Sequence, residues 1–154
     1  MAQSKPSTRS DSQKDGKQVD RTAKAPDVIV DFVFDNGLFF IAVRNISDRP
    51  AYRVSTRFDH KIVGLGGAKE ISSLPLFHNI EFLAPGKEIL TLLDSSDSYF
   101  ARQQPTKVEV QISYLDYLGD KHKVSILHDL EIYRDLPFIG KPKDVTPIID
   151  EVTD

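Results

Sequence analysis

The sequence contains no cysteine, no tryptophan and a single methionine among its 154 residues. Without cysteine the chain has no disulfides, no thiolate metal ligands and no thiol nucleophile, so its core must be held together by packing alone. No apolar run approaches the length needed to cross a bilayer, and Met1 is not followed by the apolar stretch of an export signal. We therefore expect no membrane contact and a cytoplasmic location.

The chain also lacks an excess of positive charge. Its net charge of −3 argues against binding to nucleic acid, which a strongly basic balance would favour. Residues 1–26 carry six Lys or Arg and three Asp but almost no large apolar side chains, so burial there cannot offset the entropy of ordering the backbone. We expect a disordered tail over residues 1–26, followed by one domain.

The central part of the chain, residues 27–133, shows short runs of β-branched and aromatic residues that alternate with Pro, Gly, Asn and Asp. This pattern predicts an all-β fold. We expect about seven strands: 28–34, 38–43, 51–58, 76–83, 88–93, 106–116 and 121–133. Their number and their spacing of roughly ten residues indicate an immunoglobulin-like antiparallel β-sandwich.

The connections between these strands carry recognisable signals. Asn36-Gly37 predicts a tight hairpin, because both residues accept positive φ angles. Pro85-Gly86 suits a type II turn, and capping residues predict a single helical turn at 98–103. The stretch 59–74 contains three glycines within four positions, so we expect an irregular crossing between the sheets there.

Alternation along the strands predicts which side chains share a face. In the first strand, Val28, Val30, Phe32 and Phe34 are expected to lie on one side. In the third strand, one face is expected to hold Tyr52, Val54, Thr56 and Phe58, and the other Arg53, Ser55 and Arg57.

Three arginines form the polar patch that we select as a candidate binding surface. Arg44, Arg53 and Arg57 are expected to share an outward face across two neighbouring strands, where guanidinium groups suit a partner that carries carboxylate or phosphate. The alternative is that acidic residues of adjacent strands pair with these arginines, namely Glu109, Asp129 and Glu131.

The second strand is apolar on both faces, so Leu38 and Phe40 need cover from another segment. The C-terminal extension, residues 134–154, supplies large apolar groups at Leu136, Phe138, Ile139, Ile148 and Ile149. We expect part of this extension to lie against the face at Leu38 and Phe40, or against a second copy of the chain. The alternative is a frayed end with exposed apolar residues.

The four histidines are not spaced as metal ligands, and we expect neither a metal site nor a cofactor. His128 shares a strand face with Ile126 and Leu130, so a hydrogen-bonded, partly buried imidazole is expected there. Neither a Ser-His-Asp nor a paired-carboxylate arrangement can be assigned from one sequence, because such groups meet only in space.

Four segments carry a family resemblance: Ile41–Ser47, Pro50–Val54, Leu83–Glu88 and Val110–Asp116. They read IAVRNIS, PAYRV, LAPGKE and VQISYLD. Together they resemble the bacterial cell-adhesion-related (CARDB-like) immunoglobulin-like domains, although the chain lacks the inter-sheet disulfide and core Trp of antibody domains. The resemblance implies a sandwich fold and a role in binding or spacing, and it implies no catalytic residues.

These observations predict a non-enzymatic protein-binding or assembly module with a protein partner or a second copy of itself. The alternative is a metal-assisted or hydrolytic enzyme with its site in the 59–74 crossing. A carrier with a small ligand between the sheets is disfavoured, because a filled core leaves no cavity.

Overall fold

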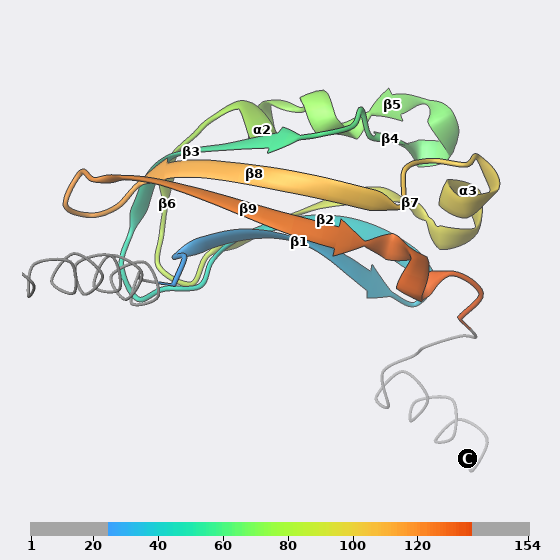
Figure 1. The fold of residues 1–154 in the computed structure, drawn as a ribbon, viewed down its shortest axis with the longest axis horizontal. Coiled ribbons are helices and arrows are strands. Elements are labelled where there is room, and N and C mark those ends of the chain that lie inside the picture. Colours follow the sequence, from blue (N-terminus) through green and yellow to red (C-terminus); the bar gives the residue numbers. More distant parts are fainter. Residues whose placement is uncertain (1–24, 137–154) are drawn as a thin grey trace, which may run out of the picture.

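The computed structural model describes residues 25–136, which form an antiparallel β-sandwich (Figure 1). Sheet A has the strand order β1-β2-β7, and sheet B has the order β6-β3-β8-β9. The strands of sheet A are β1 (Val28–Asp35), β2 (Leu38–Asn45) and β7 (Glu88–Ser95). The strands of sheet B are β6 (Ile80–Leu83), β3 (Ala51–Phe58), β8 (Lys107–Leu115) and β9 (Lys121–Asp129). The all-β prediction is confirmed.

The short strand β6, fourth in chain order among the strands of sheets A and B, pairs with β3 at the edge of sheet B. In the constant-type immunoglobulin arrangement, the fourth strand lies in the sheet of the first and second strands instead. The similarity to immunoglobulin-like and CARDB-like domains therefore stays a prediction.

Two predicted turns are present. In the β1–β2 hairpin, Asn36 has a φ of 54° and Gly37 a φ of 80°, as a type I′ turn requires. Between β6 and β7, the Lys87 amide donates to the Ala84 carbonyl at 3.0 Å, and Gly86 has a φ of 71°. These angles match the type II turn predicted there.

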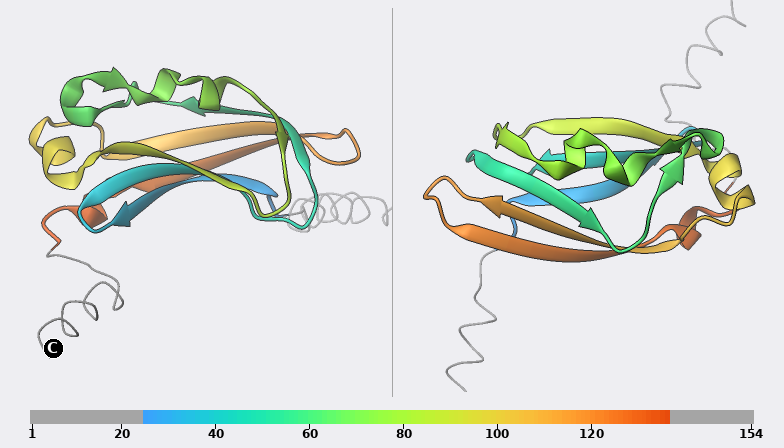
Figure 2. Two further views of the ribbon diagram at one scale, coloured as in Figure 1. Left: turned by 180° about the vertical axis from the view of Figure 1, so that it is seen from behind. Right: turned by 90° about the horizontal axis from the view of Figure 1, so that it is seen from above.

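The stretch 59–74 is irregular, as predicted, but the prediction that it crosses between the sheets is wrong, because the chain leaves β3 and returns through a helix to β6 in the same sheet B. This connection contains β4 (Val63–Gly64), β5 (Lys69–Glu70), two 3₁₀ turns (Leu65–Gly67 and Ile71–Ser73) and then α2 (Pro75–His78), which lies beside β3 (Figure 2). The strand predicted at 76–83 is wrong in its first half. Pro75 occupies the first helical turn, where its fixed φ is favourable, and the helix buries Phe77 in the core.

Gly64 allows β4 to approach β7 closely. A Cβ atom at this position would lie 2.0 Å from the carbonyl oxygen of Leu93. Any other residue would push the two strands apart, so the glycine is explained by packing.

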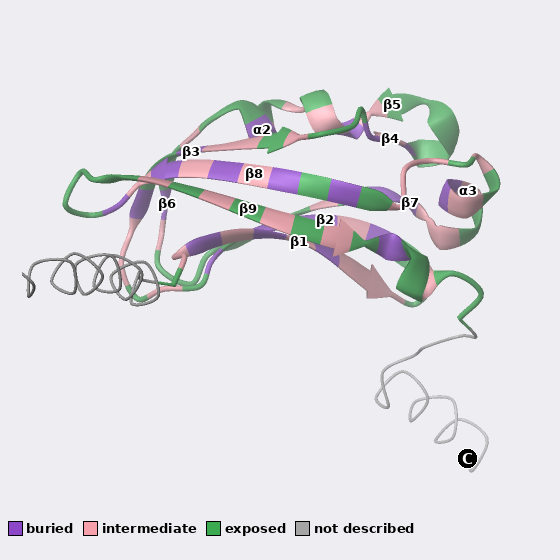
Figure 3. Cartoon of the chain, viewed as in Figure 1, coloured by how far each residue is buried: buried purple, intermediate pink, exposed green. Residues whose placement is uncertain are grey.

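Inward-facing side chains of both sheets fill the core, and Figure 3 shows this alternation along β8. The face predicted for the first strand is confirmed: Val28, Val30 and Phe32 are buried, and Phe34 packs against them. His128 also matches its prediction, because its partly buried ring donates from Nε2 to the Val30 carbonyl at 2.9 Å.

Two element ends differ from the prediction. The helix α3 (Ser96–Ala101) begins two residues earlier than expected, because Ser95 accepts from the Ser98 amide as its cap. Strand β9 ends at Asp129, whose carboxylate caps a 3₁₀ turn, Leu130–Tyr133. Within residues 25–136, no helix is long and apolar enough to span a membrane.

Strand β3 contains a bulge at Arg53. The pairing of β3 with β8 shifts between Tyr52 and Ser55, and Arg53 takes a left-handed φ of 51°. The extra residue inverts the alternation, so the prediction that Tyr52 and Val54 share a face is wrong. Tyr52 is 37% exposed, whereas Val54 is fully buried.

Candidate functional site

The outer face of sheet B carries polar and basic side chains from three adjacent strands. Cross-strand pairing places them in two rows, one of Ser55, Ser113 and Lys123 and the other of Arg57, Gln111 and Ser125. Side chains paired in this way on one face of a sheet lie side by side. The strand register therefore builds a polar floor with a cation in each row.

Two adjoining hollows, with volumes of about 410 and 440 Å³, lie over this face and share Ser113 and Lys123. We call them together the basic groove. Its basic side chains are Arg53, Arg57, Lys121 and Lys123, with the imidazole of His78. None of the described residues that line it is Asp or Glu. The groove is therefore positive on a chain whose net charge is negative.

The bulge brings Arg53 to the lining of the groove. A non-glycine residue in the left-handed region is strained, and such strain often accompanies a functional position. Arg53 lies 4.0 Å from Glu81, with 69% and 74% of the two side chains exposed. So exposed a pair interacts weakly in water, which leaves the guanidinium free to bind another anion.

Arg57 marks the boundary between the basic groove and an acidic end of the same face. Among the described residues it has no carboxylate within ion-pairing distance. On its far side, a hollow of about 150 Å³ contains Asp59 and Glu109. The Asp59 carboxylate is already engaged, since its Oδ1 accepts from the Glu109 amide at 3.0 Å and lies 2.8 Å from Nδ1 of His60.

An aromatic pair adjoins the groove. The rings of Tyr52 and Phe82 lie 5.6 Å apart on neighbouring strands and remain exposed. Tyr52 pairs with Leu115, which in turn pairs with Lys121 in the lining of the groove. The site therefore offers apolar contact beside its charges.

The three predicted arginines do not share one face. Strands β2 and β3 belong to different sheets, because the 45–50 loop crosses from one sheet to the other. Arg44 consequently lies on sheet A, where it pairs with Glu88 at 3.4 Å. The acidic partners named from the sequence are also wrong for Arg44 and Arg53, since these pair with Glu88 and Glu81.

Leu38 and Phe40 lie on the outer face of sheet A, as their strand parity predicted. Leu38 is 39% exposed and Phe40 is half-buried. The expectation that residues 134–154 cover them falls almost entirely on residues 137–154, which are outside the described part of the chain.

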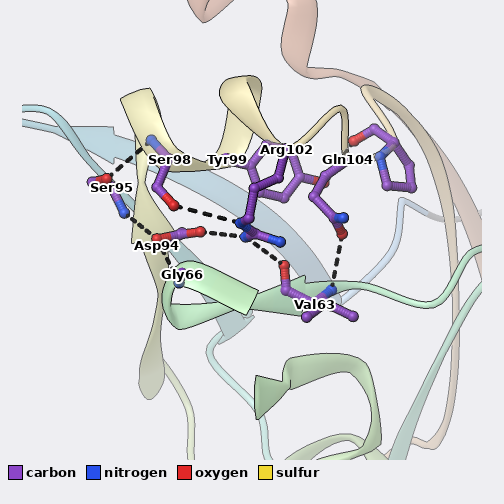
Figure 4. Close-up of polar contacts among 9 residues, drawn as sticks. Val63, Gly66, Asp94, Ser95, Ser98, Tyr99, Arg102 and Gln104 are labelled. Carbon is purple, nitrogen blue, oxygen red and sulfur yellow. Dashed lines mark hydrogen bonds and ion pairs between the residues drawn. The ribbon is translucent and has the colours of Figure 1, made fainter. Parts of the chain in front are cut away.

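Figure 4 shows how the irregular 59–74 segment is tied to α3. Asp94 is 5% exposed, and its Oδ1 accepts from the amides of Gly66 and Ser95 at 3.2 and 2.8 Å. Its Oδ2 pairs with Arg102, whose Nη2 also donates to the Val63 carbonyl at 3.1 Å. These groups satisfy one another's hydrogen bonds, so the cluster holds the 59–74 segment in place.

Tyr99 lies next to this cluster and is fully buried. Its hydroxyl donates to the Pro105 carbonyl at 2.6 Å. Burial raises the pKa of Tyr99 to about 12, because the charged phenolate would lose its hydration.

Asp116 and His122 form a second polar pair at the β8–β9 hairpin, with 2.7 Å between Oδ2 and Nε2. The hydrogen bond to His122 lowers the pKa of the Asp116 carboxyl. His122 stacks on Tyr114, a core residue, whereas Ser113 points to the opposite side of β8. Among residues 25–136 no group of three His, Asp or Glu is placed to hold a metal ion.

Sequence reasoning missed three groove residues: His78, Lys121 and Lys123. The alternation of β9 puts Lys121 and Lys123 on its outer face, but only the pairing of β9 with β8 places them next to Ser113 and Leu115. His78 joins the groove because residues 75–78 form a helix. The sequence signal for this helix is Pro75, because proline is favoured in the first turn of a helix.

A family model described as "Domain of unknown function (DUF8453)" matches residues 5–134. No curated protein and no solved structure matches the chain.

Proposed function

The chain belongs to the DUF8453 family of unknown function, and from that premise we propose that it is a non-enzymatic binding module that holds an acidic segment of a partner protein in the basic groove. The observation that carries the proposal is the lining of the groove: four Lys or Arg side chains and no Asp or Glu among the described residues. Carboxylates of a partner would complete these interactions.

The groove suits an extended segment. Its floor is a flat array of short polar side chains, Ser55, Ser113 and Gln111, which leave room for a backbone and can hydrogen-bond to it. Arg53 and Arg57 lie on the same strand on one side, and Lys123 lies on the other. A segment lying between them would meet cations on both sides, and Tyr52 and Phe82 would add apolar contact at one end.

The length of the basic region favours an acidic peptide over a nucleic acid. The same face becomes acidic beyond Arg57, at Asp59 and Glu109. A long polyphosphate continuing past Arg57 would be repelled there, whereas a short run of Asp or Glu would not reach these carboxylates. The cytoplasmic location expected from the sequence is part of the same proposal.

The proposal is tested by fluorescence anisotropy with a labelled oligoglutamate peptide added to the full chain. We expect binding that weakens with salt, because surface charges are screened. The variant Arg57→Glu/Lys123→Glu should raise the Kd at least about tenfold, since it replaces two attractions with two repulsions. The matched control Arg44→Glu/Lys87→Glu makes the same charge change on the other side of the molecule and should leave the Kd nearly unchanged.

Three results would overturn the proposal: no binding of oligoglutamate at low salt, equal affinity of the groove variant and the control, or tighter binding of a thymidine oligonucleotide than of the peptide. The last result would identify a nucleic acid as the partner.

A further inference from the structure

The outer face of sheet A differs sharply from that of sheet B. We call its large side chains the apolar face: Ile29, Val33, Leu38, Phe40, Leu90 and Leu92. Leu38, Leu90 and Leu92 are 39%, 50% and 40% exposed. They adjoin one another in the sheet, because Phe40 pairs with Leu92 and with Val33. A contiguous apolar patch on a sheet face marks a surface that another segment covers.

The described part of the chain ends at one end of the sandwich, next to the hairpin where this face begins. Tyr133 stacks on Phe34 at 5.4 Å, and the Arg134 guanidinium lies 4.5 Å from the centre of the Phe100 ring. These contacts place the end of the described chain at the β1–β2 hairpin, on the side of sheet A (Figure 1). Leu38 is the first residue of β2 at that same end. The chain after Leu136 therefore continues from the same end of the sandwich at which Leu38 begins the apolar face.

The following residues have the composition and length to cover the face. Residues 137–154 contain two apolar groups, Phe138-Ile139 and Ile148-Ile149, with Lys141 and Lys143 between them. Fully extended, these 18 residues span about 59 Å, roughly twice the ~27 Å length of the 8-residue strand β2. The face itself carries Asp31 between Ile29 and Val33, which is a complementary charge for either lysine.

We propose that the C-terminal segment 137–154 of the same chain docks on the apolar face through its two apolar groups. The attachment at Leu136 favours this segment over a second copy, because a covalently linked partner acts at a high effective concentration. This inference is independent of the basic groove, which lies on the opposite sheet.

The absence of cysteine makes the test simple, because an introduced cysteine is the single thiol of the chain. Leu90→Cys in the full-length chain places that thiol on the apolar face, in the edge strand β7. We expect it to react with a thiol reagent about tenfold more slowly than the same thiol in a chain that also carries Ile148→Asp/Ile149→Asp. Ser125→Cys on the outer face of sheet B is the control, and its rate should not respond to the C-terminal substitutions.

Protection that is independent of protein concentration and is lost on Ile148→Asp/Ile149→Asp supports the proposal. Equal rates with and without the aspartates overturn it. Protection that increases with protein concentration also overturns it and identifies a second copy as the cover. Leu92→Cys repeats the measurement at a neighbouring position should Leu90→Cys not give the β-rich circular dichroism spectrum of the parent chain.

Discussion

The bulge in β3 leads to a prediction that is unusual for a strand. With glycine at position 53 the protein should be more stable than with valine at that position. Arg53 has a φ of 51°, where a side chain with a Cβ costs about 1–2 kcal/mol. Replacing Arg53 by glycine removes that cost, while the greater freedom of glycine in the unfolded chain returns about 0.5–1 kcal/mol. The exposed pair with Glu81 contributes less than about 0.5 kcal/mol.

The net expectation for Arg53→Gly is therefore a change of unfolding free energy between about −0.5 and about +1.5 kcal/mol. Arg53→Val should lose about 1–2 kcal/mol, because a β-branched residue is especially disfavoured at positive φ. The two variants should thus differ by about 2 kcal/mol, which corresponds to roughly 1 M in the midpoint of a urea titration followed by circular dichroism.

Arg57 on the same strand provides the matched control, because its φ is not positive. At an ordinary strand position the order reverses, and Arg57→Val should be more stable than Arg57→Gly by about 0.5–1 kcal/mol. If Arg53→Val proved at least as stable as Arg53→Gly, the strained bulge and the orientation of Arg53 that depends on it would both be refuted. In the anisotropy assay, Arg53→Gly should bind the acidic peptide more weakly although its unfolding free energy stays close to that of the parent chain.

The cluster at Asp94 and the buried Tyr99 give two further predictions. Arg102→Met leaves the buried Asp94 carboxylate without its cation and should lower the unfolding free energy by about 3 kcal/mol. The double variant Arg102→Met/Asp94→Asn should recover most of that loss. A loss below about 1 kcal/mol for Arg102→Met in urea unfolding would contradict the structure. The pKa of Tyr99 is raised to about 12, so near pH 10.0 the unfolded chain releases its phenol proton while the folded chain retains it. The contribution of Tyr99 to the stability of the folded state is therefore complete below pH 10 and is lost as the pH rises toward 12. Tyr99→Phe should flatten that alkaline loss in unfolding experiments at increasing pH, and an unchanged pH dependence would count against the buried phenol.

Sequence patterns predicted those features that depend on residues close together in the chain. The Asn36-Gly37 and Pro85-Gly86 turns, the inward face of β1 and the partly buried His128 all follow from local φ preferences or from alternation. Local signals failed where the packing partner decides between two states. Residues 76–78 were predicted as strand, but with Pro75 they form a helix that buries Phe77 against the core.

The candidate site shows the same division. Alternation identified Arg53 and Arg57 as outward-facing, and it identified Leu38 and Phe40 as lying on an outer face, because a two-residue period needs no knowledge of the partner strand. Which sheet each strand joins depends on contacts between distant parts of the chain. That is why Arg44 was wrongly grouped with Arg53, and why Lys121 and Lys123 were missed.

The amino-acid sequence alone thus determined that this protein is a β-protein with turns at defined positions, since turn geometry and side-chain alternation are properties of neighbouring residues. Only the tertiary structure decided that strands β3, β8 and β9 of sheet B place four cations around one polar floor. It also decided that the outer face of sheet A presents an apolar surface. Strand order, register and a single-residue bulge set those surfaces, and each depends on pairing across the whole domain.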